Sequence, residues 1–493
     1  MKRVEELIKD IEVVETRGKA ELLKGWITGV TEDSRQVKPG YIFVAKHGTK
    51  QTGEKFIPDA IKRGATVVVR ESPCENSELF ENVLQIRVRN TREALSRLVL
   101  RFFDEPQKRL TLIGITGTNG KTSVSYFLKE FLRKKGIKTG YIGTLCYEID
   151  KVYKALHTTP PIETLSFYLS EMVKRGFSHC VMEVSSHALS QERVCGLEFD
   201  ACVFTNLSPE HLDYHSDLED YYQAKKRLFL DYAKKNAVGV ISLETEWGKR
   251  LAEEVKPLFK NLILTNTPEF CVKKIKDDLL EVRIFGKVFK VSSGLSGYQL
   301  KNLATVCGVL LGMGFPLEEV IEGIQTLSPP EGRLEKVAEY KGAKFFVDYA
   351  HTPDALKEAI LSVRDFAKNR VIVVFGCGGD RDKHKRAPMG EIATTLADYA
   401  IVTSDNPRTE PPEAIIEDIL KGIKGKNYEV VVDRKEAIKR AVSIAEEGDV
   451  ILVAGKGHED YQEIQGKRIP FSDRLVILEA TSERKGCEHE CGK

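Results

Sequence analysis

A glycine-rich segment near the end of the first quarter of the chain constrains the fold most. Residues 114–122 read G-I-T-G-T-N-G-K-T and stand between the apolar run Leu110–Ile115 and a helix-like stretch that starts near Thr122. Glycines at a strand-to-helix turn let backbone N–H groups converge on phosphate oxygens, while Lys121 can neutralise phosphates and the Thr122 hydroxyl can ligate Mg²⁺. The segment predicts ATP binding by an α/β domain, in a variant form because Ile115 stands where the common loop has its first glycine.

Composition excludes several classes of protein. The 493 residues exceed one core and suggest about three domains, and a net charge of only +2 gives a nucleic-acid partner no electrostatic support. The N-terminus is charged and no apolar run is long enough to span a membrane, so we expect a cytoplasmic protein, and a monomer. Three cysteines in apolar segments are expected to be buried and reduced: Cys180, Cys202 and Cys377.

Two cysteines near the C-terminus, Cys487 and Cys491, could form half of a metal site. No second pair of ligands with suitable spacing accompanies them in the sequence. The sequence therefore does not favour a metal site there.

The rhythm of apolar runs and turns divides the chain into three parts. Residues 1–108 show short β-like runs, among them Trp26–Val30, and predict a small α/β domain that ends after a helix at Thr91–Phe103. Residues 109–333 alternate strands and helices, which indicates a doubly wound, mainly parallel sheet that carries the phosphate loop. Residues 334–493 repeat strand and helix more regularly, which predicts a Rossmann-like domain without a dinucleotide fingerprint.

Polar motifs follow the strands of the last two domains. Glu183 ends the predicted strand His179–Glu183, and His211 follows the predicted strand Ala201–Thr205. Both strand ends should lie beside the phosphate loop, where a carboxylate and an imidazole can hold Mg²⁺ between ATP and an acceptor carboxylate. In the last domain, polar groups follow the strands at 348–351, 376–381, 405–408 and 455–459.

These motifs together resemble the Mur ligase family over essentially the whole chain. They are G-T-N-G-K-T, E-V-S-S-H-A-L from Glu183, N-L-S-x-E-H-L-D-Y-H from Asn206, Y-x-x-A-K ending at Lys225, G-R-L-E at Gly332–Glu335, D-Y-A-H-T-P at Asp348–Pro353 and D-N-P-R at Asp405–Arg408. Within the family the chain is most similar to the UDP-N-acetylmuramoyl-tripeptide synthetases. The resemblance implies a three-domain ligase that uses ATP and Mg²⁺ to add one amino acid to UDP-N-acetylmuramoyl-L-alanyl-D-glutamate, through an acyl phosphate, in peptidoglycan precursor synthesis.

The resemblance also implies the ATP and metal sites. The phosphates would be held by Gly117, Thr118, Asn119, Gly120, Lys121 and Thr122. Adenosine would contact Asn302, Arg333 and Asp348. The metal ligands would be Thr122, Glu183, His211 and Lys225, the last as a carbamate, and the catalytic residues would be Lys121, Glu183, His211 and Lys225. Three positions depart from the family pattern: His157, Gln299 and the segment at 242–245.

Two further groups of residues would bind the other substrates. By resemblance, the nucleotide-sugar dipeptide would contact Ser34, Thr158, Thr159, Ser185, Gln191 and Arg193. The added amino acid would contact Arg381, Asp405, Asn406, Pro407, Arg408, Gly455 and Glu459.

Arg408 decides which amino acid is expected. In the family, D-N-P-R is typical of ligases that take meso-diaminopimelate, whose distal carboxylate a guanidinium can bind with two hydrogen bonds. Lysine ends in an ammonium group, which Arg408 would repel. The alternatives are a lysine-adding ligase, a folylpolyglutamate synthetase and a non-catalytic ATP-binding protein.

Overall fold

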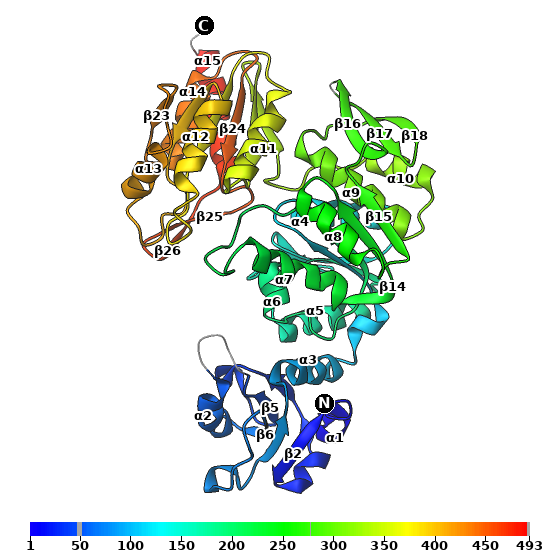
Figure 1. The fold of residues 1–493 in the computed structure, drawn as a ribbon. Helices are drawn as coiled ribbons and strands as arrows, with labels where there is room; N and C mark the ends of the chain where they lie inside the picture. Colours follow the sequence, from blue (N-terminus) through cyan, green and yellow to red (C-terminus); the bar gives the residue numbers. More distant parts are fainter. Residues whose placement is uncertain (47–51, 277, 491–493) are drawn as a thin grey trace.

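The computed structural model describes residues 1–46, 52–276 and 278–490 and contains three α/β domains in a row (Figure 1), as predicted. The first domain is built on a five-stranded sheet of order β2-β7-β6-β5-β4, in which only β2 is antiparallel. Its strands are β2 (Val13–Gly18), β4 (Gly29–Thr31), β5 (Tyr41–Val44), β6 (Ala65–Arg70) and β7 (Leu84–Val88). Helices α1 (Val4–Leu7), α2 (Ile57–Lys62) and α3 (Thr91–Phe102) complete it.

The prediction of one strand at Trp26–Val30 was wrong. This segment forms two short strands in different sheets, because β3 (Trp26–Ile27) pairs with β1 (Lys2–Arg3) whereas β4 pairs with β5. Thr28, between them, donates its backbone N–H to Gly40 in the turn before β5. Thr28 thus lies at the point where the pairing with β1 ends and the pairing with β5 begins.

The central domain contains an eight-stranded sheet of order β11-β10-β9-β12-β8-β13-β14-β15. Its strands are β8 (Thr111–Thr116), β9 (Thr139–Ile142), β10 (Cys146–Glu148), β11 (Val152–Lys154), β12 (His179–Glu183), β13 (Phe199–Phe204), β14 (Ala233–Ser242) and β15 (Asn261–Thr265). All neighbouring strands are parallel except at β10, which is antiparallel to both β9 and β11. Apolar clusters cover both faces, as expected for a parallel sheet.

Helices on both faces of this sheet supply those clusters. They are α4 (Lys121–Lys134), α5 (Ile162–Lys174), α6 (Ser186–Ser190), α7 (Leu218–Leu230), α8 (Glu246–Val255), α9 (Tyr298–Gly312) and α10 (Leu317–Ile324). An antiparallel sheet of β16 (Phe270–Lys276), β17 (Leu279–Ile284) and β18 (Lys287–Ser292) is an unpredicted addition that packs against α9.

The last domain is a six-stranded sheet of order β19-β20-β24-β21-β22-β23, parallel except for β19. Its strands are β19 (Glu335–Tyr340), β20 (Ala343–Asp348), β21 (Val371–Phe375), β22 (Tyr399–Val402), β23 (Tyr428–Val430) and β24 (Val450–Ala454). Its helices are α11 (Pro353–Arg364), α12 (Arg386–Leu396), α13 (Pro412–Leu420), α14 (Arg434–Ile444) and α15 (Asp473–Glu490). A hairpin of β25 (Tyr461–Ile464) and β26 (Lys467–Pro470) precedes α15.

Neighbouring domains touch through a few defined contacts. Helix α3 packs on its own sheet and against the central domain, and both share one apolar cluster (Figure 1). The central and last domains meet where the Tyr298 backbone N–H donates to the Ser362 hydroxyl and where Lys301 pairs with Glu358 at 3.1 Å. The predicted boundaries near residues 109 and 334 lie in the turn before β8 and directly before β19.

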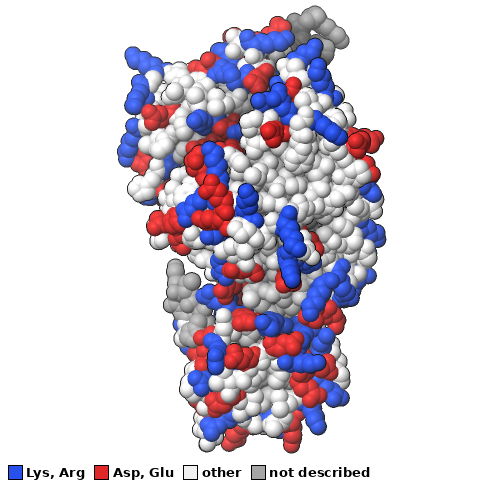
Figure 2. Space-filling view, turned by 45° about the vertical axis from the view of Figure 1, so that its right-hand side comes forward, with Lys and Arg blue, Asp and Glu red and all other residues white. Residues whose placement is uncertain are grey.

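On the face shown in Figure 2, basic and acidic side chains are interspersed, and a broad uncharged area lies among them in the upper half of the view. This distribution agrees with the small net charge. In the part of the chain that the structure describes, no helix is long and apolar enough to cross a bilayer. Of the C-terminal cysteines, Cys491 and the side chain of Cys487 lie outside the described residues, whereas Cys180, Cys202 and Cys377 are buried and free, as predicted.

Candidate active site

The phosphate loop joins β8 to α4, and two of its glycines have positive φ. A Cβ at Gly117 (φ 147°) would lie 1.9 Å from the Thr205 hydroxyl oxygen, and one at Gly120 (φ 85°) would lie 2.5 Å from Asn302 Oδ1. Neither position accepts a side chain without a shift of its neighbours. Glycine therefore lets the loop approach β13 and α9 closely, which leaves the N-terminus of α4 open to a ligand.

Two lysines meet at one carbonyl of this loop. Lys121 Nζ donates to the carbonyl oxygens of Gly117 and Thr118, both at 2.8 Å, and Lys225 Nζ donates to the same Gly117 oxygen at 2.7 Å. Desolvation lowers the pKa of Lys121, and desolvation together with repulsion by Lys121 lowers the pKa of the buried Lys225 far below that of an ordinary lysine. Burial and a neighbouring positive charge both favour the unprotonated form of this amine.

Glu183 ends β12 as predicted and is fully buried. Its Oε1 accepts hydrogen bonds from the Tyr141 hydroxyl at 2.7 Å and the Thr144 backbone N–H at 2.9 Å. Its Oε2 accepts from the hydroxyls of Thr122 at 3.0 Å and Thr144 at 3.1 Å. The carboxylate thus lies directly beside the hydroxyl of the phosphate-loop threonine, and both oxygens are oriented by neutral donors.

His211 follows β13 and has a positive φ of 58°. Burial lowers the pKa of its imidazole to about 4, although Glu210 acts in the opposite direction. The ring is therefore neutral at pH 7 and keeps a nitrogen lone pair that can bind a metal ion. Lys121 and Lys225 are close enough to influence the same imidazole, so the structure brings Lys121, Glu183, His211 and Lys225 to one place.

Glu210 belongs to this cluster, although its neighbour His211 alone was predicted. Burial raises the pKa of the Glu210 carboxyl, but a hydrogen bond with His351 and the nearby positive charges outweigh this effect. The net result is a pKa well below its usual value. Its Oε1 lies 3.3 Å from His351 Nε2, which belongs to the last domain. The sequence signal for Glu210 is its position directly before His211, in a motif from which only the histidine was predicted to be functional.

A cavity of about 300 Å³ lies on one side of the phosphate loop. The three residues predicted for adenosine, Asn302, Arg333 and Asp348, all line it, together with Thr122 and Tyr298. Asn302 Nδ2 and Arg333 Nε are buried with no recorded hydrogen-bond partner, so both are available to a ligand. Asp348 accepts from the Tyr298 hydroxyl at 2.6 Å and the Leu334 N–H at 2.7 Å. It therefore connects α9 of the central domain to the hinge, the segment at residues 332–334 that leads into the last domain.

A second cavity, of about 500 Å³, lies between the central and last domains. It contains residues predicted for both remaining substrates: Thr158, Ser185, Arg193, Arg381, Asp405, Asn406, Arg408, Gly455 and Glu459. His211 and Glu210 also line it, and Tyr349 and His351 line both cavities. The metal candidate His211 therefore lies where the two predicted substrate regions meet.

The residues predicted for the dipeptide are connected to Glu183 through hydrogen bonds. Thr159 Oγ1 donates to the Glu183 carbonyl at 2.8 Å and accepts from the Ser185 N–H, while Arg193 donates to the Thr159 carbonyl at 2.9 Å. Gln191 Oε1 accepts from Arg193 at 2.7 Å. Ser34 lies apart from them in the first domain, where its buried hydroxyl interacts with the Asp59 carboxylate.

The residues predicted for the amino acid come from three loops at the carboxyl ends of β21, β22 and β24. Arg408 has a positive φ of 52°, donates to the Gly379 carbonyl at 2.7 Å and lies 3.5 Å from a Glu463 carboxylate oxygen. Asp405 Oδ2 is buried, accepts no hydrogen bond in the described chain and lies 4.0 Å from the buried Arg434 guanidinium. Arg381 is exposed, whereas Pro407 does not line the cavity but shapes the loop, since its carbonyl lies against Gly379.

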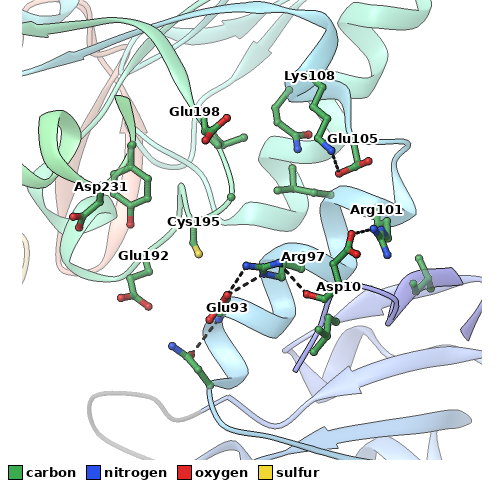
Figure 3. A pocket seen from close by; sticks show the side chains of 18 of the residues that line it. Asp10, Glu93, Arg97, Arg101, Glu105, Lys108, Glu192, Cys195, Glu198 and Asp231 are labelled. Atoms are coloured by element: carbon green, nitrogen blue, oxygen red, sulfur yellow. Dashed lines mark hydrogen bonds and ion pairs between the residues drawn. The ribbon is translucent and has the colours of Figure 1, made fainter. Parts of the chain in front are cut away.

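A third cavity, of about 540 Å³, lies between the first and central domains and contains none of the predicted site residues (Figure 3). Its charged side chains pair with one another, as Glu93 does with Arg97 and Glu105 with Lys108. Such paired groups give no sign of the chemistry of a ligand.

Within the described ranges no cluster of three or more His, Cys, Asp or Glu side chains has metal-binding geometry. A metal ion beside the phosphate loop would therefore need oxygen atoms from a ligand or from a modified Lys225.

Comparison with known proteins agrees with this arrangement. Models of three Mur ligase domains match the chain: the Mur ligase family, catalytic domain at residues 26–103, the Mur ligase middle domain at 115–310, and the Mur ligase, glutamate ligase domain at 332–457. The chain belongs to the Mur ligase family.

Among its relatives are ligases with one shared name. It is 40% identical to the UDP-N-acetylmuramoyl-L-alanyl-D-glutamate–2,6-diaminopimelate ligase of Clostridium tetani, over 98% of this chain and 99% of that one. The ligase of the same name from Aquifex aeolicus is also 40% identical, over 92% and 93%. A solved structure with this name matches with a TM-score of 0.67 and 31% identity, over 95% and 97% of the chains. The MurF ligase of Thermotoga maritima, solved with ADP, shares the fold with a TM-score of 0.62, 20% identity and coverage of 92% and 97%.

Proposed function

We propose that this protein is an ATP-dependent ligase that adds meso-diaminopimelate to the D-glutamate of UDP-N-acetylmuramoyl-L-alanyl-D-glutamate, a step of peptidoglycan precursor synthesis in the cytoplasm. The observation that carries the proposal is the pair of adjoining cavities. One contains the phosphate loop and Asn302, the other contains Arg193, Arg408 and His211, and Tyr349 and His351 line both. An acyl group activated by ATP and an incoming amine would meet at this junction.

The residues of the ATP side fit a magnesium nucleotide. The α4 N-terminus and Lys121 suit the phosphates, and the unpartnered Asn302 Nδ2 and Arg333 Nε suit the nucleoside. Thr122, Glu183 and His211 offer a hydroxyl, a carboxylate and a neutral imidazole to Mg²⁺. Bound Mg²⁺ would neutralise charge on the phosphates and the acceptor carboxylate.

Lys225 is proposed to act as a carbamate. Its neutral amine would add to carbon dioxide and lose a proton, and the resulting N-carboxylate would be a further oxygen ligand. The low pKa of the buried amine supports this modification, because only the unprotonated form is nucleophilic. In its unmodified form the amine is held by the Gly117 carbonyl.

The chemistry would then proceed in two transfers. A carboxylate is a poor electrophile, so its oxygen first takes the γ-phosphoryl group of ATP and ADP leaves. The amine of the amino acid then attacks the acyl phosphate, and phosphate leaves. Arg193, held by the Thr159 carbonyl, would orient the dipeptide, while Lys121 and the loop amides would stabilise charge during phosphoryl transfer.

Arg408 and Glu459 are proposed to select the amino acid. The Arg408 guanidinium is only loosely paired with Glu463, at 3.5 Å, so a substrate carboxylate can compete for it. Glu459 and Asp405, whose Oδ2 accepts no hydrogen bond from a described residue and lies 4.0 Å from Arg434, provide carboxylate oxygens for an ammonium group. A substrate with a carboxylate and an ammonium at its distal end fits this arrangement better than lysine does.

The test is an amino-acid panel. Purified protein with ATP, Mg²⁺ and the UDP-linked dipeptide should release phosphate with meso-diaminopimelate and little with lysine. Equal or faster release with lysine would contradict the specificity. Absence of release with any amino acid would favour a non-catalytic ATP-binding protein.

A further inference from the structure

A buried lysine beside the second cavity, next to the residues predicted for the amino acid, has no part in the proposed mechanism. Lys456 is 0% exposed, and its Nζ donates to Asn406 Oδ1 at 3.0 Å and to Glu459 Oε2 at 2.8 Å. Asn406 Nδ2 donates to the same Glu459 oxygen at 2.8 Å. The three side chains form a closed triangle of hydrogen bonds in which Lys456 lies behind the two residues that face the cavity.

The turn after β24 places this lysine inward. Gly455 and Gly457, on either side, have φ values of 120° and 53°, and a Cβ on Gly457 would lie 2.7 Å from the Tyr349 side chain. The turn also packs on Gly332, where a Cβ would lie 2.2 Å from the backbone nitrogen of His458. The two glycines therefore let the chain turn here and direct the long Lys456 side chain between the loops after β22 and β24.

Stability alone gives little reason for a charge at this position. Replacing a buried ion pair by apolar side chains of similar volume is often neutral or even stabilising. The geometry instead ties Lys456 to orientation of the site. The hydrogen bonds recorded for the Glu459 carboxylate in the described chain all reach Oε2, which leaves Oε1 for a substrate.

We propose that Lys456 is a positioning residue for the amino-acid substrate: it fixes the rotamers of Glu459 and Asn406 so that Glu459 Oε1 faces the ammonium group of the incoming diamino acid. The inference rests on the proposed function. Without Lys456, among the described residues, Glu459 Oε2 keeps only the Asn406 Nδ2 donor, at 2.8 Å, and Asn406 Oδ1 keeps only the Glu463 N–H, at 2.9 Å. Productive binding would then require the site to be ordered by the substrate itself.

Steady-state kinetics of Lys456→Met test this role. Methionine has a similar length but neither charge nor donors, so the KM for meso-diaminopimelate should rise at least tenfold while the KM for ATP changes less than twofold. Lys129→Met is the matched control, because Lys129 is also buried and paired, with Glu148 at 2.9 Å, but lies outside both cavities. Its KM for the amino acid should stay within twofold of wild type.

A double-mutant comparison separates positioning from a structural role. If Lys456 acts through Glu459, Lys456→Met combined with Glu459→Gln should raise the KM no more than Glu459→Gln alone. Multiplicative effects, or an unchanged KM in Lys456→Met, would overturn the proposal. If Lys456→Met unfolds, Lys456→Gln, which keeps one donor, replaces it in both measurements with the same criteria. Wild-type protein that releases no phosphate with meso-diaminopimelate would instead contradict the proposed function.

Discussion

Single residues in the site work because their surroundings change their chemistry. Lys121 and Lys225 share one carbonyl oxygen. Burial lowers the pKa of both amines, and repulsion by Lys121 lowers that of Lys225 further. Burial also keeps the His211 imidazole neutral. Each shift favours the form that the proposed chemistry needs: an unprotonated amine at Lys225 and a free lone pair at His211.

The carbamate at Lys225 can be tested by replacement and rescue. Lys225→Ala should lower kcat by a hundredfold or more, since it removes a proposed metal ligand, and a short carboxylic acid such as acetate should restore part of it. Mass spectrometry under carbon dioxide should find the added mass on the wild-type lysine. Full activity of Lys225→Ala without acid would refute the role.

Arg408 determines selectivity at the same scale. A charge-assisted hydrogen bond contributes about 1.5–3 kcal/mol, so Arg408→Met should raise the KM for meso-diaminopimelate about 10- to 100-fold and lower the discrimination against lysine. Lys421→Met, at an exposed lysine of the same domain, is the control. A KM that rises equally for both amino acids would argue against recognition of the distal carboxylate.

At the scale of elements, the site consists of the ends of parallel strands. The pairing of Glu183 with Ile115 and of Phe204 with Thr116 sets the ends of β12, β8 and β13 side by side. The sequence predicted this part because apolar strands end in polar motifs at the same edge of a parallel sheet. It did not predict Glu210 or Lys456, since their partners, His351 and Asn406, lie 141 and 50 residues away in the sequence. It also missed β16–β18, whose alternation is interrupted by many lysines.

Gly117 tests the phosphate-loop turn. In Gly117→Ala the new methyl group would meet the Thr205 hydroxyl oxygen in a backbone conformation with positive φ. We expect a loss of about 1–3 kcal/mol in the free energy of unfolding and a large rise in the KM for ATP. Gly136→Ala, whose Cβ would meet nothing within 4 Å, controls for the strain of a positive φ alone. Unchanged ATP affinity in Gly117→Ala would contradict the assigned loop.

The anchor of the C-terminal helix can be tested in the same way. Arg434 and Asp473 are both fully buried and joined by two hydrogen bonds of 2.8 Å between α14 and α15. Because loss of one partner leaves a buried charge unpaired, Asp473→Ala should lower the stability of the last domain by about 3–5 kcal/mol in urea unfolding. Glu479→Ala breaks the exposed Lys435–Glu479 pair between the same helices and should cost less than about 1 kcal/mol. Similar costs for both variants would refute this account.

In the molecule as a whole, the central and last domains must keep their relative position because residues of both line the cavity predicted for adenosine. Tyr298 in α9 of the central domain donates to Asp348 at the end of β20, and Arg333 at the hinge donates to Thr122 at 3.2 Å. Movement of the last domain would therefore alter the ATP site and the amino-acid site together. Domain closure and catalysis are expected to be coupled for this reason.

Tyr298→Phe should weaken this coupling. Loss of one hydrogen bond to a buried carboxylate costs about 1–3 kcal/mol, so the KM for ATP should rise several-fold in titrations at fixed amino acid. Tyr399→Phe, in β22 and away from both cavities, should leave it unchanged. An equal effect of both variants would show that the contact does not support the nucleotide site.

In the proposed reaction, ATP activates a carboxylate which the amino acid then captures. Labelling the D-glutamate side-chain carboxylate with oxygen-18 and following the label by mass spectrometry distinguishes this route from simple ATP hydrolysis. Each phosphate released with meso-diaminopimelate should carry one labelled oxygen from that carboxylate. Unlabelled phosphate, with both labelled oxygens still on the dipeptide, would contradict it.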